Sequence, residues 1–129
     1  VYKLRTGGEK ITCTREEFGE QILGILDGIQ KSLFEKAKAF REEHTRDLAT
    51  RAELEAFFTP ENVEKPEIHG GFVRGGWCGE TPCEEEVQGA LKVTIRCIPL
   101  GAEPFSGTCV GCGKPSKADQ PKVVWAKSY

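Results

Sequence analysis

The sequence lacks long hydrophobic runs and contains little histidine. No apolar segment approaches the roughly 18 residues that a membrane-spanning helix needs. No charged-then-apolar leader precedes the first strand-like segment, so we expect neither a membrane span nor a secretory signal. The chain has only two histidines, and it shows no GxGxxG, P-loop or Ser/His/Asp pattern. We therefore expect no catalytic centre within these residues.

An excess of basic residues is also missing. The net charge is -2. Residues 1–69 hold 11 Lys and Arg against 14 Asp and Glu, and residues 70–129 hold 7 against 6. A broad electrostatic surface for nucleic acid is therefore excluded, although a local basic patch is not.

The length and composition are those of a folded globular protein. The 129 residues suffice for one ordinary domain or two small ones, with 38% apolar and 29% charged residues. The chain starts with Val1 rather than Met, inside an ordered pattern. We expect it to be a fragment of a longer protein or a processed product.

The first part of the chain predicts a hairpin followed by a long helix. Tyr2 and Leu4 alternate with polar residues before a Gly-Gly turn, as in a β-hairpin. Thr14 and Glu17 then form a capping box. The helix should continue to about Glu43, because apolar residues recur at three- and four-residue steps. These residues are Phe18, Ile22, Ile25, Ile29, Leu33, Ala37 and Phe40.

The second part predicts shorter elements. Thr50 and Glu53 form another capping box before a short helix, and residues 59–71 have the prolines and glycines of a linker. Strands are expected in "GFVRGGW", "LKVTIRCIPL" and "KVVWAKSY", with a short helix in "TPCEEEVQGA". The predicted class is α+β: a small metal-stabilised α/β domain preceded by a hairpin and a long helix. The expected parts are residues 1–14, 15–59 and 60–129.

Six cysteines carry the strongest chemical signal. An even number is compatible with three disulfides, for which 15 connectivities exist. However, Cys109-Val-Gly-Cys112 is a CxxC pair, and such pairs are more typical of metal sites or redox centres. Without a leader peptide, a reducing cytosol is the expected compartment.

A second cysteine pair completes a metal-site pattern. Cys78 and Cys83 are separated by four residues, and 25 residues lie between Cys83 and Cys109. Thr81 and Glu84 suggest a capping box that places Cys83 in the first turn of a helix, where the positive end of the helix dipole favours a thiolate. Four thiolates in two close pairs match a closed tetrahedral structural zinc site. Such a site leaves no coordination position for an activated water.

The remaining cysteines and the tryptophans are expected to be structural. Cys97 lies on a strand that we expect to be buried, and Cys13 lies at a helix entry, so both are interpreted as small core residues. Trp77 and Trp125 are interpreted as core residues because no basic residues are interleaved with them.

Several segments resemble one enzyme family. "GGFVRGGWCG", "CEEE", "TIRCIPL", "GTCVGCGKPSK" and the terminal "VVWAKSY" are similar to the C-terminal zinc-binding domain of prolyl-tRNA synthetases of the archaeal and eukaryotic-like architecture. "TGGEKITCTREEF" resembles the closing hairpin of the anticodon-binding domain of that family, and "ILDGIQKSLFEKAKAF" resembles its connecting helix. The resemblance covers nearly the whole chain.

The resemblance implies specific roles for residues. The zinc ligands of the family fall on Cys78, Cys83, Cys109 and Cys112, and Tyr129 matches a terminal tyrosine whose carboxylate reaches toward the synthetase active site. The parent enzyme would ligate proline to tRNA(Pro), with ATP and Mg²⁺ bound only in a catalytic domain upstream of this chain. The implied partners are the catalytic and anticodon-binding domains of the same enzyme, in a cytoplasmic homodimer without membrane contact.

Two other functions remain open from the residues alone. A free-standing zinc-ribbon-like module would bind a protein or RNA, and it should show an exposed basic or aromatic face. A redox protein would use the Cys109/Cys112 pair, and its thiolate should stay reactive when zinc is present.

Overall fold

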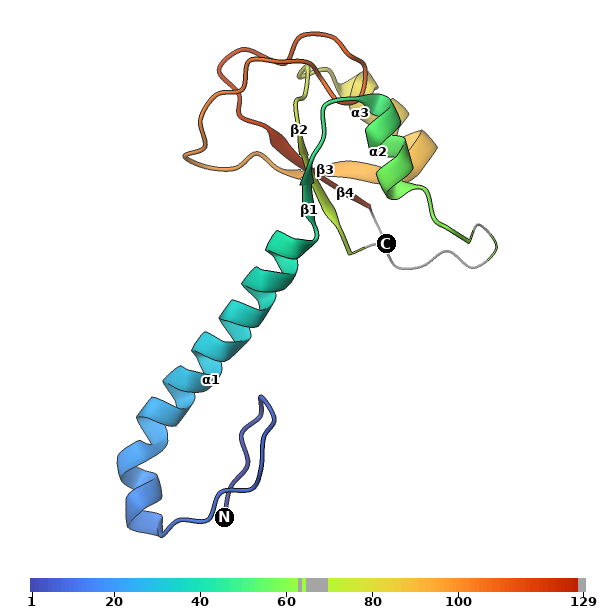
Figure 1. Ribbon diagram of the computed structural model, residues 1–129. Coiled ribbons are helices and arrows are strands. Elements are labelled where there is room, and N and C mark those ends of the chain that lie inside the picture. The colour runs from blue at the N-terminus through green and yellow to red at the C-terminus, as the bar shows by residue number, and fades with distance from the viewer. Residues whose placement is uncertain (63, 65–69, 128–129) are drawn as a thin grey trace. The chain divides into compact units, whose positions relative to one another are not determined.

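The computed structural model describes residues 1–62, 64 and 70–127 (Figure 1). The chain divides into two compact units, Val1–Glu43 and His44–Tyr129. The first unit contains the N-terminal hairpin and one long helix, and the second contains a four-stranded sheet with two short helices. The predicted α+β class is confirmed. The expected domain boundaries at residues 14/15 and 59/60 remain predictions about the longer protein.

The hairpin of the first unit is paired at a single position. Tyr2 and Ile11 exchange two backbone hydrogen bonds, each 2.8 Å long. Between them Gly7 and Gly8 have φ values of 108° and 92°, a region of backbone conformation that glycine adopts without strain. The ring centroids of Tyr2 and Phe18 are 5.1 Å apart. The hairpin thus contacts the start of the helix that follows it.

Helix α1, Arg15–Glu43, has the length that the apolar period predicts. Its capping box is present: the Thr14 N–H donates to Glu17 Oε2 at 2.8 Å, and the Glu17 N–H donates to Thr14 Oγ1 at 3.2 Å. No residue of α1 is buried. The most exposed large apolar side chains of this helix are Leu23, Leu26, Leu33, Phe34 and Phe40. Across the described residues, no helix has both the length and the apolar character needed to cross a bilayer.

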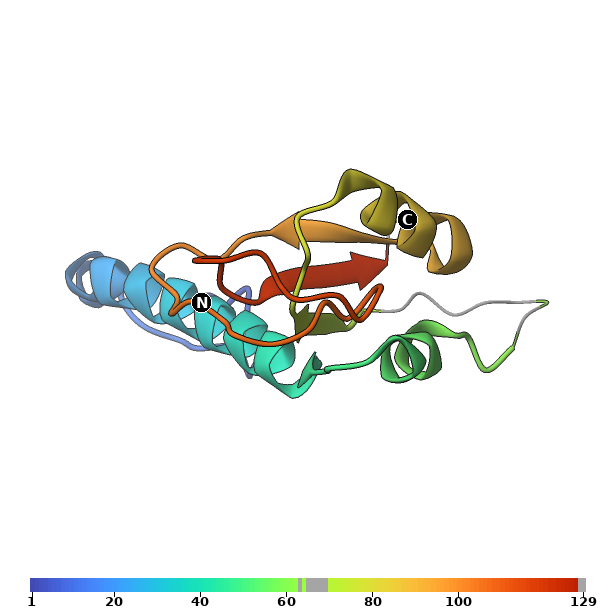
Figure 2. The ribbon, with the colours of Figure 1, turned by 90° about the horizontal axis from the view of Figure 1, so that it is seen from above.

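The sheet of the second unit has the strand order β1-β2-β4-β3. The strands are β1 (Thr45–Asp47), β2 (Phe72–Gly75), β3 (Val93–Cys97) and β4 (Val123–Lys127). β1 is parallel to β2, whereas β4 is antiparallel to both of its neighbours. Figure 2 shows β4 between β2 and β3. The last strand in the sequence is therefore central in the sheet, which ties the carboxyl end of the chain into the core.

Two helices pack with the sheet in the hydrophobic core of this unit. α2 (Arg51–Phe58) begins with the predicted Thr50/Glu53 capping box, and α3 (Thr81–Leu91) joins β2 to β3. The fully buried side chains of both helices, of three strands and of the irregular segment between β3 and β4 form one cluster. Its members are Leu54, Phe58, Val73, Val87, Val93, Val110, Val123 and Trp125. The prediction that Trp125 is a core residue is confirmed, and the half-buried Trp77 packs against this cluster.

Two features of this unit differ from the sequence-based expectation. β1 is a three-residue edge strand, "TRD", that carries no apolar alternation and was not predicted. Cys97 is exposed rather than buried. The register of β3 against β4 shifts between Ile95, which pairs with Trp125, and Cys97, which pairs with Val124. This irregularity breaks the alternation that predicted a common face for residues 95 and 97.

The core cluster predicts a large effect for its biggest side chain. Replacing Trp125 by alanine removes a fully buried indole from the central strand, so the free energy of unfolding should fall by about 3–5 kcal/mol. Urea unfolding followed by circular dichroism measures this loss. Val124→Ala, on the other face of the same strand and only half-buried, is the matched control and should cost about 1 kcal/mol or less. Equal costs for the two variants would contradict this core.

Candidate metal centre

The first half of the site lies between β2 and α3. Cys78 follows β2 in a tight turn in which Gly79 has a φ of 85°. Cys83 lies in the first turn of α3, with Pro82 at the helix start. The predicted Thr81/Glu84 capping box is wrong: the N-cap is Glu80, and it makes no side-chain capping bond. The Glu84 carboxylate instead accepts the Ile95 N–H at 3.0 Å, which ties the cysteine-bearing helix to β3.

The second half is a compact loop before β4. The Gly113 N–H donates to the carbonyl of Cys109 at 2.8 Å, and the Cys109 N–H donates to the carbonyl of Lys114 at 2.7 Å. Gly113 has a φ of 73°, a conformation that favours glycine. These bonds curl residues 109–114 so that the sulfurs of Cys109 and Cys112 can bind the same metal ion.

Backbone hydrogen bonds hold the two halves together. Gly76 pairs with Cys109 in a parallel bridge, and the Val110 N–H donates to the Gly76 carbonyl at 3.0 Å. The Lys117 N–H donates to the carbonyl of Trp77 at 2.9 Å. The cysteine pairs are far apart in sequence, yet they lie on adjacent, directly bonded segments.

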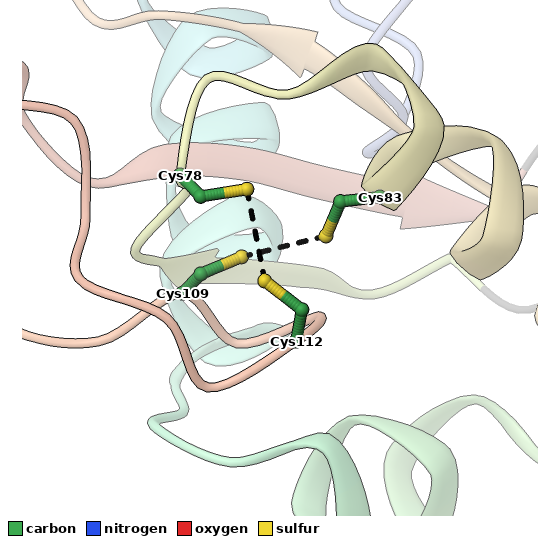
Figure 3. A group of neighbouring side chains, drawn as sticks. All are labelled: Cys78, Cys83, Cys109 and Cys112. Carbon is green, nitrogen blue, oxygen red and sulfur yellow. Dashed lines mark hydrogen bonds between the residues drawn. The ribbon is translucent and has the colours of Figure 1, made fainter.

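The four sulfur atoms converge on one point, as Figure 3 shows. The Sγ atoms of Cys83 and Cys109 are 3.7 Å apart, as are those of Cys78 and Cys112. All four sulfurs lie within 4.8 Å of one another. Zn–S bonds of about 2.3 Å in a tetrahedron place sulfurs about 3.8 Å apart. The donor set and its spacing therefore fit a four-coordinate, thiolate-loving divalent ion such as Zn²⁺.

The electrostatics of the thiols point the same way. Burial raises the pKa of Cys83, and the neighbouring sulfurs of Cys112 and Cys109 raise it further. Burial also raises the pKa of Cys78. The helix terminus is expected to stabilise a Cys83 thiolate. Without a cation, burial and the neighbouring sulfurs outweigh that stabilisation. Negative charge on all four sulfurs at this spacing requires a positive ion among them.

Cys109 differs from the other cysteines. It is 1% exposed, and this burial raises its pKa. Hydrogen bonds from backbone N–H groups, first those of Cys112 and Cys78, bring the pKa below its ordinary value. Backbone donors that point at a sulfur favour the thiolate form that binds metal.

The backbone of Gly111 completes the cradle. A Cβ atom at this position would lie 2.9 Å from Cys83 Sγ, 3.0 Å from Val87 Cγ2 and 3.6 Å from Cys109 Sγ. The space that a side chain would need is therefore occupied by two of the sulfurs and by the Val87 side chain of α3. Only glycine fits between Val110 and Cys112 without moving the donors.

The structure brings together the four cysteines that the sequence singles out, and it leaves Cys13 and Cys97 outside the cluster. All six are free thiols. Tyr129 lies outside the described residues. One neighbour of the site was missed: Arg51 Nη1 lies 3.4 Å from the carbonyl oxygen of Gly111. Nothing in the sequence indicates this contact, because the expected linker of residues 59–71 separates Arg51 from Cys78.

Comparisons with known proteins identify the same region. The family model described as "Prolyl-tRNA synthetase, C-terminal" matches residues 61–129. The "Proline--tRNA ligase" of Protochlamydia amoebophila is 43% identical over 121 residues, which cover 93% of this chain and 23% of that protein. The "Proline--tRNA ligase" of Lachnospira eligens is 39% identical over 129 residues, covering 100% of this chain and 25% of that protein. The chain thus spans about a quarter of the length of these relatives.

A solved structure shares the fold. The crystal structure of prolyl-tRNA synthetase from Cryptosporidium parvum, complexed with halofuginone and AMPPNP, matches 94% of this chain and 24% of its own chain, with a TM-score of 0.70. At 23% sequence identity, this match shows the fold alone. The family model covers more than half of the chain, including all four clustered cysteines. The chain therefore belongs to the prolyl-tRNA synthetase family, as its C-terminal part.

Proposed function

We propose that this chain is the structural zinc domain at the C-terminus of an enzyme that ligates proline to tRNA(Pro) with ATP. The observation that carries the proposal is the convergence of four cysteine sulfurs at the spacing of a tetrahedral metal–thiolate centre. Zn²⁺ would be held by Cys78, Cys83, Cys109 and Cys112. When bound, it neutralises thiolate charge and cross-links two loops; with four protein ligands it leaves no site for activating water.

The protein's residues perform the structural work. Cys83 joins α3 to the loop of residues 109–114, and Cys78 joins the end of β2 to the same loop. Residues 98–122, between β3 and β4, contain no helix or strand. A connection of this length has little local structure to hold it. Metal ligation would therefore add to the few backbone hydrogen bonds that hold this segment, and apparent zinc binding of about 10–16 kcal/mol is enough for that role.

The long helix supports a connecting role in the whole enzyme. α1 exposes a row of large apolar side chains, and none of its residues is buried in this chain. Such surface is normally covered by other parts of a protein. The missing three quarters of the enzyme would supply that cover through the anticodon-binding and catalytic domains, the latter holding ATP and Mg²⁺. We place the enzyme in the cytoplasm, in accord with six cysteines that form no disulfide, and we expect it to be a homodimer as the family resemblance implies.

Metal removal should unfold the second unit. Treating the zinc-loaded protein with a strong chelator should abolish the cooperative circular dichroism melt of residues 44–127, because four clustered cysteines, of which only Cys112 is exposed, lose the ion that offsets their charge. Re-addition of Zn²⁺ should restore it. Cys109→Ser should reproduce the loss, whereas Cys97→Ser, outside the cluster, should not. An unchanged melt after chelation would contradict the proposed metal centre.

Gly111 allows a more local test. Gly111→Ala places a methyl group against two sulfurs, so the zinc-loaded protein should lose about 1–3 kcal/mol of unfolding free energy through overpacking. Gly89→Ala, at an open position of α3, should instead stabilise the helix by up to about 1 kcal/mol. Thermal melts of both variants measure the difference. A Gly111→Ala variant as stable as the parent would contradict the cradle.

The enzyme-level proposal is tested in the full-length protein. It should charge tRNA(Pro) with proline, and deletion of Tyr129 should lower the rate of ATP-dependent proline activation without changing zinc content. The reason is that the proposed role of Tyr129 is a carboxylate directed to the active site. Absence of proline charging would refute the ligase assignment. Normal activation by the truncated enzyme would refute only the role of Tyr129.

A further inference from the structure

We propose that Arg51 is a positioning residue of the metal centre. Its guanidinium group fixes the backbone of the Cys109–Cys112 loop and offsets the negative charge of the metal-bound sulfurs. This inference rests on the proposed zinc site and adds to it a residue from a different part of the chain.

Arg51 reaches the cysteine loop from α2. It is the first residue of that helix, directly after the Thr50 cap. Its Nη1 atom lies 3.4 Å from the Gly111 carbonyl oxygen, across 60 positions of sequence. Its side chain is 24% exposed, and it lines an open cavity of about 500 Å³ together with Cys109 and Cys112. The guanidinium therefore contacts the backbone of the loop that carries the CxxC pair.

Two carboxylates orient this guanidinium. Arg51 Nε donates to Glu55 Oε1 at 2.7 Å within α2. Nη1 also lies 3.7 Å from Glu86 Oε1, on α3, the helix that carries Cys83. One side chain thus contacts α2, α3 and the loop of residues 109–112. The planar fork of arginine suits this arrangement, whereas a lysine could not make all three contacts.

The charge of the loaded site explains what the contact does. Four thiolates around a divalent cation carry a net charge of −2, and Arg51 offsets part of it, since Glu55 and Glu86 share the positive charge of its guanidinium. The Gly111 carbonyl belongs to the residue whose backbone packs against Cys83 and Cys109 sulfurs. Holding that carbonyl keeps the adjacent N–H groups directed at Cys109. The helix cap itself does not depend on Arg51, because Glu53 and Thr50 form it.

The test measures metal retention in the full chain. Arg51→Gln removes the charge and the fork, and Arg51→Lys keeps only the charge. Arg96→Gln is the matched control, because it removes an arginine of the same unit that donates to the Lys127 carbonyl and not to the cysteine loop. Zn²⁺ release to a chromogenic chelator gives the rate of loss, and Co²⁺ substitution gives the thiolate-to-metal absorption bands. Circular dichroism of each loaded variant confirms that it is folded.

Arg51→Gln should release Zn²⁺ about 10-fold faster than the parent and shift the Co²⁺–thiolate bands, with Arg51→Lys intermediate and Arg96→Gln close to the parent. Parent-like release from Arg51→Gln would overturn the inference. So would equal acceleration by Arg96→Gln, which would assign the effect to a general loss of stability in this unit. Failure of the parent itself to give tetrathiolate Co²⁺ bands would instead refute the metal centre of the proposed function.

Discussion

The cost of placing negative charge on four clustered cysteine sulfurs is the constraint on which the second unit depends. The chain folds two distant loops so that sulfurs from each lie 3.7 Å from a sulfur of the other. Burial raises the pKa of Cys83 and Cys78, so the thiols resist ionisation until a cation is shared among them. A bound Zn²⁺ would turn this repulsive cluster into a cross-link. The glycines, backbone bonds and helix start around the cluster serve that single geometry.

The hydrophobic core of the unit lies next to the four clustered cysteines. β4, the last strand in the sequence, is central in the sheet and contributes Trp125 to the core. The irregular segment before it contains Cys109 and Val110, both fully buried. Val110 belongs to the same core cluster as residues of α2 and α3. Metal ligation and hydrophobic packing thus act on neighbouring residues, and loss of either one should weaken the other.

Much of this could be predicted from the sequence, because its signals are local. The CxxC and CxxxxC spacings single out the four cysteines that the structure brings together, and the apolar period of α1 gives its extent. Other features depend on contacts that no local pattern encodes. The irregular register of β3 moves Cys97 to the surface. The Glu84 carboxylate accepts a hydrogen bond from the Ile95 N–H instead of capping its helix. The Arg51 side chain contacts the Gly111 carbonyl, 60 residues further along the chain. β1 pairs with β2 through its backbone and through the ion pair of Asp47 with Arg74, and it shows no apolar alternation.

The central claim is that one Zn²⁺ ion is bound by four cysteine sulfurs. X-ray absorption spectroscopy at the zinc edge tests it most directly on the purified full chain. The account predicts one zinc per chain and a single scattering shell of four sulfurs at about 2.3 Å. A shell containing nitrogen or oxygen, fewer than four sulfurs, or protein that folds without bound metal would contradict it.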